Sequence, residues 1–134
     1  MKWELGEYEI DTDSRRLDID KLFFLLSNSY WAKERPRATV EESIKHSLNF
    51  GIYKRKEQIG FARVITDKAV FSWLMDVIIE DSYRGEGLGK WLVQTILEHP
   101  DVKLTSIGLA TKDAHTLYEK YGFEHKEMMR RPRP

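Results

Sequence analysis

The chain has 134 residues, of which 41% are hydrophobic and 33% charged, so we predict one domain over residues 1-134. Lysine and arginine number 22 and so do aspartate and glutamate, so no net charge draws the chain to nucleic acid or to an anionic membrane. Cysteine is absent, which excludes disulfides, cysteine-based zinc sites and catalysis through a cysteinyl acyl-enzyme.

Neither a signal or membrane-spanning segment nor a metal site is expected. Residues 1–7 contain no apolar signal region, and no stretch approaches the roughly 18 consecutive apolar residues of a membrane span, so we expect a cytoplasmic protein. The histidines at 46, 99, 115 and 125 form no i,i+4 pair, so no metal site is assigned.

The N-terminal part predicts one strand and two helices. Residues 8–11 form a weak first strand, and Asp18 is an expected N-cap for a helix whose apolar residues recur at helical spacing as far as Leu26. The sequence Thr-Val-Glu-Glu at 39–42 resembles a capping box, which predicts that a second helix opens there.

Strand patterns follow at 50–54, 59–65 and 70–79. Asp76 is the only charge in residues 71–79, and period-two alternation places it on the face opposite Trp73, Met75 and Val77. Its carboxylate could act as a general base through water or anchor an ammonium group. The structural alternative is an aspartate satisfied by the backbone or by an arginine such as Arg63.

A glycine-rich turn at 84–89, Arg-Gly-Glu-Gly-Leu-Gly, ends the last strand and opens a helix that continues to Pro100. Glycine lets backbone N–H groups converge on an anion, and the helix N-terminus adds partial positive charge, so we expect a bound pyrophosphate. The turn fits neither the dinucleotide fingerprint, because Lys90 replaces its third glycine, nor a P-loop, because Trp91 replaces the hydroxyl residue. A tight connection without a ligand is the alternative.

The C-terminal part predicts a strand at 103–110 and then a helix. Ala114, Leu117, Tyr118 and Tyr121 would share one helix face, Gly122 would end the helix, and Phe123 would begin another strand. The last residues, 130–134, resemble a frayed end.

Two motifs carry a family resemblance. Residues 84–89 match [Q/R]-x-x-G-x-[G/A], and 114–123 match A-x-x-[LF]-Y-x-x-x-G-F. Together they resemble the GNAT superfamily of N-acetyltransferases over about Ile19 to Phe123. The resemblance implies an α/β fold, with a mixed sheet of six or seven strands and about four helices on its two faces. It also implies acetyl-coenzyme A as co-substrate, no metal, and acetylation of a primary amine by direct attack in a ternary complex.

The resemblance also implies roles for individual residues. Tyr118 corresponds to the general acid beside the coenzyme sulfur, and Asp76 is the candidate on the amine side. Coenzyme contacts are expected from the main chain of Val77, Ile78 and Ile79, from the loop residues Arg84, Gly85, Glu86, Gly87, Leu88, Gly89 and Lys90, and from Thr111. The acceptor pocket is expected to include Tyr30, Trp31, Arg35 and Trp73.

Two positions depart from the family pattern. Thr111 stands where asparagine is usual, which puts its pantetheine contact in doubt, and Asp81 stands where proline is frequent.

Rival functions are a coenzyme A-binding regulatory or interaction module without turnover and, disfavoured by the zero net charge, a nucleic-acid-binding domain. The expected partner is a small-molecule amine, with a homodimer possible. The two motifs do not distinguish among the candidate acceptor amines, which are small metabolites, polyamines, aminoglycosides, peptide N-termini and lysine side chains.

Overall fold

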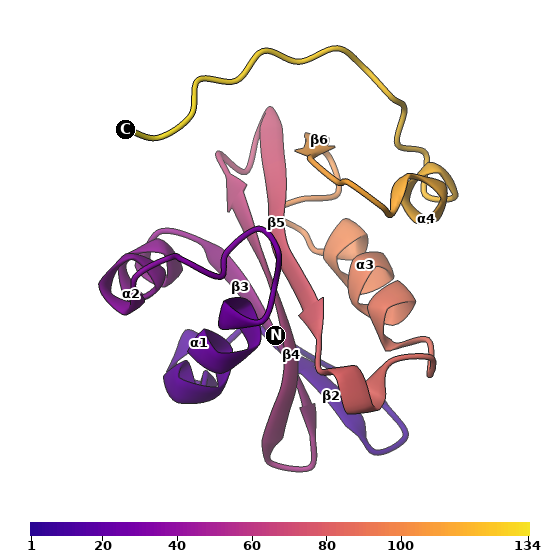
Figure 1. Cartoon of the computed structure of the whole chain (residues 1–134). Helices are drawn as coiled ribbons and strands as arrows, with labels where there is room; N and C mark the ends of the chain where they lie inside the picture. Colours follow the sequence, from indigo (N-terminus) through magenta and orange to yellow (C-terminus); the bar gives the residue numbers. More distant parts are fainter.

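A computed structural model, which describes residues 1–134, has six strands in one mixed sheet with the spatial order β1 to β6 (Figure 1). Each successive pair from β1 to β5 is antiparallel, whereas β6 runs parallel to β5. The strands are β1 (Lys2–Leu5), β2 (Tyr8–Asp11), β3 (Leu48–Lys54), β4 (Glu57–Thr66), β5 (Phe71–Ile79) and β6 (Ser106–Leu109).

Four helices cover the two faces of the sheet. The helices α1 (Ile19–Ser27) and α2 (Arg37–Lys45) lie on one face, and α3 (Leu88–Glu98) and α4 (His115–Glu119) lie on the other side in Figure 1. Because β5 and β6 are parallel, α3 is the crossover that returns the chain to the same end of the sheet. The predicted α/β class is confirmed, and the six strands and four helices agree with the expected six or seven strands and about four helices.

Each face has its own apolar core. Leu92 and Ile96 of α3 pack with sheet residues such as Phe50, while Leu22 of α1 packs with Phe61 and other residues of the opposite face. All five of these side chains are at most 1% exposed. Burial of each contributes about 1.5–3 kcal/mol, so both helical layers are firmly held to the sheet.

A β-bulge interrupts β5 at Asp76. Phe61 of β4 faces Ile78, but Arg63, two residues later, faces Met75, so β5 carries one extra residue. Asp76 accordingly has a φ of 55°, a conformation that aspartate tolerates better than most residues.

The bulge changes which side chains share a face. Leu74 and Ile79 belong to the same core although strict alternation would separate them. Arg63 contacts both Met75 and Asp76, so the expectation that these two lie on opposite faces is wrong. The extra residue is the physical reason.

Several predicted boundaries also need correction. Residues 8–11 form the second strand, because Lys2–Leu5 precede them in a hairpin. The second helix begins at Arg37 instead of Thr39, with the extended residue Pro36 as its N-cap, so Thr39 lies inside the helix and does not cap it. The strand expected over 103–110 is confined to Ser106–Leu109, and none forms at Phe123.

The sixth strand is therefore the edge of the sheet, and residues after 123 run past it without helix or strand. None of the helices combines the length and apolar character that a membrane span requires.

Candidate functional site

The strands β5 and β6 part halfway along β5. They are paired only where Phe71–Leu74 of β5 meets β6, so Met75–Ile79 have no strand partner on that side. A cavity of about 470 Å³ opens at this point. Its lining comes from β5, from the segment between α1 and α2, from the segment between β6 and α4, and from the C-terminal tail.

Tyr118 reaches this cavity from α4. Its side chain packs in the core against Phe123, with ring centroids 5.6 Å apart, and the residue is 9% exposed. The hydroxyl forms no hydrogen bond with any protein group, and burial raises the pKa of Tyr118 above its usual value. The cavity wall thus contains a protonated phenol whose hydrogen-bonding capacity is free.

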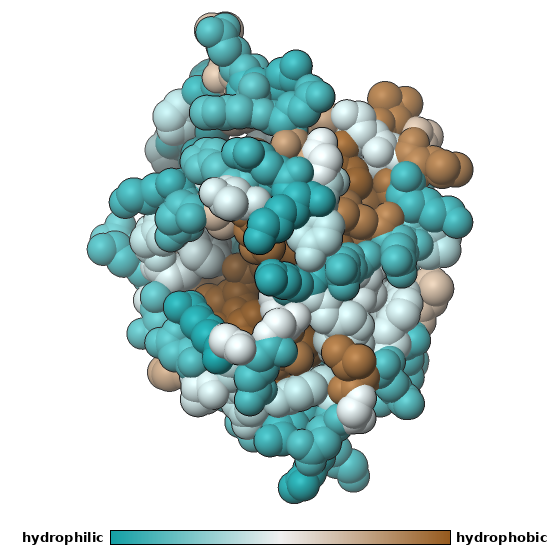
Figure 2. Space-filling view, turned by 90° about the vertical axis from the view of Figure 1, so that its right-hand side faces the viewer, coloured by the Kyte–Doolittle hydropathy of each residue, from teal (hydrophilic) through white to brown (hydrophobic).

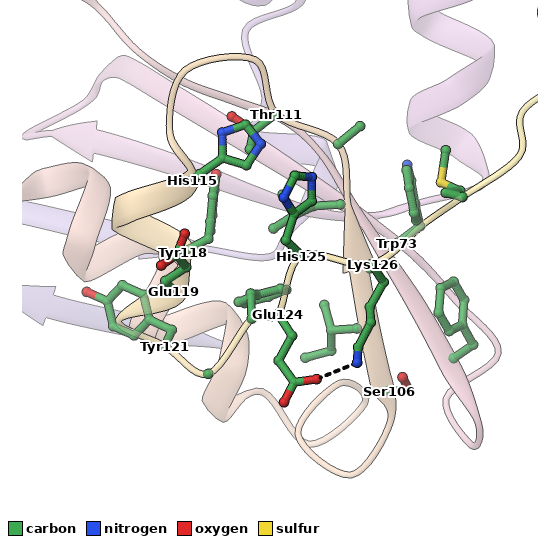
Figure 3. A pocket seen from close by; sticks show the side chains of 18 of the residues that line it. Trp73, Ser106, Thr111, His115, Tyr118, Glu119, Tyr121, Glu124, His125 and Lys126 are labelled. Carbon is green, nitrogen blue, oxygen red and sulfur yellow. Dashed lines mark ion pairs between the residues drawn. The ribbon is translucent and has the colours of Figure 1, made fainter.

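A second cavity of about 790 Å³ adjoins the first on the side of β6, α4 and the tail. Figure 3 shows this cavity, with Trp73, Thr111 and Tyr118, which line both cavities, and with the ion pair between Glu124 and Lys126. Figure 2 shows hydrophobic surface within hollows bordered by hydrophilic residues on this side of the molecule. Thr111 also accepts a hydrogen bond from the Ala114 amide, so its hydroxyl supports the start of α4.

The glycine turn connects the unpaired end of β5 to α3. Gly85 and Gly87 have φ values of 85° and 78°, and a Cβ built on either would meet no atom within 4 Å. Gly87 is the N-cap of α3 and supplies no side-chain hydrogen bond, so N–H groups of the first turn remain available. Space, free donors and the helix dipole together fit an anion such as a pyrophosphate.

Charged side chains surround this turn. Arg84 is exposed and pairs with Asp81 at 3.1 Å, and Lys90 is exposed in the first turn of α3. Tyr8 donates a 2.5 Å hydrogen bond to Glu86, which raises the pKa of Tyr8 to about 12. This bond ties the one acidic side chain of the turn to β2.

Asp76 lies in the wall of the first cavity and is surrounded by donors. Its Oδ1 accepts a hydrogen bond from Trp31 Nε1 at 2.9 Å. Its Oδ2 accepts from Arg35 Nη1 at 2.8 Å and from Arg63 Nε at 2.7 Å. Burial favours the neutral acid, but the hydrogen bonds and charges of the two arginines outweigh it and lower the pKa of Asp76.

The four residues expected in an acceptor pocket, Tyr30, Trp31, Arg35 and Trp73, all line this cavity. The Tyr30 hydroxyl accepts a 3.3 Å hydrogen bond from the Lys112 amide, which joins the α1–α2 segment to the β6–α4 segment. This bond bridges two walls of the cavity that Asp76 and Tyr118 also line.

The side chains of Ile78 and Ile79 are buried in the two cores, so only their backbone can reach a ligand. Sequence reasoning missed Lys112, Asp113 and Arg130, which also line the cavity. Charged residues in a loop and in a tail give no signal that separates a cavity wall from a solvated surface.

Comparisons with known proteins agree with this geometry. A family model described as an acetyltransferase (GNAT) domain matches residues 45–125. A solved structure from Xanthomonas campestris pv. campestris, of a protein assigned to the GNAT family of acetyltransferases, matches with a TM-score of 0.91 and 39% identity. That match covers 98% of this chain and 96% of the other.

Two curated relatives extend the comparison. An uncharacterised N-acetyltransferase of Porphyra purpurea is 28% identical over 119 residues, 84% of this chain and 68% of that protein. A histone acetyltransferase of Glycine max is 30% identical over 113 residues, 81% of this chain but only 46% of its own length. With the family model matching more than half of the residues and a solved family member matching nearly end to end, the chain belongs to the GNAT family of acetyltransferases.

Proposed function

We propose that the protein transfers the acetyl group of acetyl-coenzyme A to a primary amine by direct attack in a ternary complex. One observation carries this proposal: Tyr118, whose hydroxyl has no hydrogen-bond partner in the protein, lines the same cavity as the unpaired edge of β5. The glycine turn follows that strand after a short 3-10 helix at Asp81–Tyr83. This order of Tyr118, the free edge of β5 and the glycine turn supports the proposal, because an extended thioester would need a proton donor, backbone donors and an anion site in that order.

The glycine turn, residues 84–90, would bind the pyrophosphate through backbone N–H groups. The free edge of β5 at Val77–Ile79 would offer main-chain groups to the pantetheine arm and to the carbonyl oxygen of the acetyl group. Such donors stabilise the negative charge that develops on this oxygen during attack.

The chemistry then needs few side chains. The neutral amine attacks the thioester carbon, a C–N bond forms, and the C–S bond breaks. The departing sulfur takes the proton of Tyr118, and the amine nitrogen loses a proton to solvent water. Solvent water then reprotonates Tyr118.

Asp76 would serve as a positioning residue in this scheme. Both of its carboxylate oxygens accept hydrogen bonds, and its lowered pKa makes it a poor base. Its three donors include two residues of the acceptor pocket, Trp31 and Arg35. We therefore assign Asp76 the task of holding that side of the pocket in place.

Gly87→Val tests the coenzyme site. The substitution places a branched side chain in the open space of the cradle and forces a β-branched residue to a φ of 78°. We expect isothermal titration calorimetry to show at least about tenfold weaker binding of coenzyme A, since about 1.4 kcal/mol of lost contact suffices for that change.

Gly89→Ala is the matched control. Its φ is not positive, its Cβ would meet nothing within 4 Å, and it lies inside α3, so we expect binding to be retained. Equal affinity of wild type and folded Gly87→Val would refute the assignment of the pyrophosphate to this turn.

A thiol-release assay tests the function as a whole. Acetyl-coenzyme A is incubated with the protein and a panel of small amines, polyamines, aminoglycosides and lysine peptides, the last because a soybean relative is named as a histone acetyltransferase. Amine-dependent thiol release with an acetylated product of the expected mass supports the proposal. Calorimetric binding of the coenzyme without any release would favour the non-catalytic coenzyme-binding module instead.

A further inference from the structure

We infer that the acceptor is a small amine that also carries a carboxylate, and that Arg35 binds this carboxylate. The inference rests on the proposed amine acetylation and specifies its substrate class. It comes from the balance of charge in a buried cluster, two of whose three members, Arg35 and Asp76, line the 470 Å³ cavity.

The buried cluster formed by Arg35 and Asp76 of the wall, with Arg63 behind them, holds more positive than negative charge. Asp76 faces two guanidinium groups, those of Arg35 and Arg63, and the side chains of these three residues are 1%, 15% and 8% exposed in that order. One aspartate compensates one arginine, so the cluster retains one positive charge. A second negative charge would neutralise the cluster, and a ligand that enters the cavity is the available source of that charge.

Arg35 is the member of the cluster that can still bind a ligand. All the nitrogens of Arg63 are engaged, with Asp76, Ser47 and Met75 as partners. Arg35 uses only Nη1, toward Asp76, and it lines the cavity while Arg63 does not. Its Nε and Nη2 form the planar two-donor edge that matches a carboxylate.

The Arg35 side chain is also held in place. Its partner Asp76 is fixed from the other side by Trp31 and Arg63. A guanidinium positioned in this way loses little conformational freedom when it binds an anion.

The charged residues at the rim of the cavity do not reverse the preference of the buried cluster for an anionic acceptor. Lys112 and Asp113 are adjacent, exposed and opposite in charge, and Arg130 adds another positive charge. The surroundings of the acceptor are therefore positive overall. Such a field disfavours a polyamine, whose remaining ammonium groups would be repelled, and favours the neutral form of the attacking amine.

The test is a comparison of matched acceptors in the thiol-release assay. Homologous series of α- and ω-amino carboxylates are measured against the corresponding carboxamides, which have nearly the same size without the charge, and against the corresponding phosphonates. We expect kcat/KM for the best carboxylate to exceed that of its carboxamide by about 10- to 100-fold. In Arg35→Gln this ratio should fall to within about threefold of one, whereas Lys33→Gln, an exposed charge change in the same segment, should keep it.

Each alternative outcome has a definite meaning. A wild-type preference for carboxamides, polyamines or phosphonates would overturn the inference and leave amine acetylation intact. An unchanged ratio in Arg35→Gln would also overturn it, because Arg35 would not be the binding group. If Arg35→Gln folds poorly, Arg35→Lys keeps the charge and should retain only part of the ratio. Absence of turnover with every amine would overturn the proposed function and the inference with it.

Discussion

Tyr118→Phe is expected to lower kcat by about 10²- to 10⁴-fold and to leave coenzyme A binding nearly unchanged. The substitution removes the phenolic proton, which would otherwise be donated to the departing sulfur, and keeps the ring that packs against Phe123. Because the hydroxyl has no protein partner, the loss should not destabilise the fold. The measurements are single-turnover rates, calorimetric coenzyme affinity and thermal unfolding on the same preparation.

Tyr121→Phe provides a matched control. Tyr121 lies three residues further on, is half-buried, and does not line the 470 Å³ cavity, so the same chemical change there should alter kcat by less than about twofold. An unaltered rate in Tyr118→Phe, with the chemical step shown to be limiting, would reduce Tyr118 to a packing residue.

Asp76→Asn is expected to lower the free energy of unfolding by about 3–5 kcal/mol, because it leaves Arg35 and Arg63 buried without a counter-charge. Asparagine has the same shape and also tolerates the φ of 55°, so the loss reports the charge and not the backbone. The measurement is urea unfolding at neutral pH. In a thermal scan the midpoint should fall by roughly 10 °C or more.

The effect should depend on pH in a particular direction. The pKa of Asp76 is lowered in the folded protein, so its contribution is fully present above the pKa of the unfolded chain, about 4, and declines as the pH falls toward the folded value. The difference in stability between wild type and Asp76→Asn should therefore be constant near neutral pH and shrink in acid.

Two companion variants separate the loss of charge balance from other causes of the lower stability of Asp76→Asn. Asp113→Asn, an exposed aspartate at the same cavity, should change stability by less than about 0.5 kcal/mol. Adding Arg63→Gln to Asp76→Asn should cost less than the sum of the single changes, because it removes one of the two uncompensated charges. Normal stability of Asp76→Asn with slow turnover would return Asp76 to the role of a base.

The glycine turn and the α4 motif could be predicted from the sequence because their physics is local. Positive φ at Gly85 and Gly87 needs only the absence of a Cβ, and the position of Tyr118 on its helix follows from spacing within a few residues. The same holds for the alternation of most strands. These short-range features were enough for the family and the α/β class, and the place of the coenzyme stays a prediction.

The other half of the site depends on contacts between distant residues. Asp76 meets Trp31 and Arg35, which are 45 and 41 positions away in the sequence, and a β-bulge turns its carboxylate toward them. The face of Asp76 was predicted from the period-two alternation of a regular strand, and the bulge breaks this alternation at Asp76 itself. The β-propensities of the residues in the strand do not indicate a bulge there.

The sequence by itself therefore determined the family and pointed to the residues that we propose as the anion cradle, in the glycine turn, and as the proton donor, Tyr118. Only the tertiary structure decided that Asp76 is a hydrogen-bonded partner of two arginines with a lowered pKa, and that Arg35 lines the cavity while only its Nη1 is bonded. The physical reason is that a charge acquires its role from the groups packed around it, and those groups come together only when the helices and the sheet are assembled.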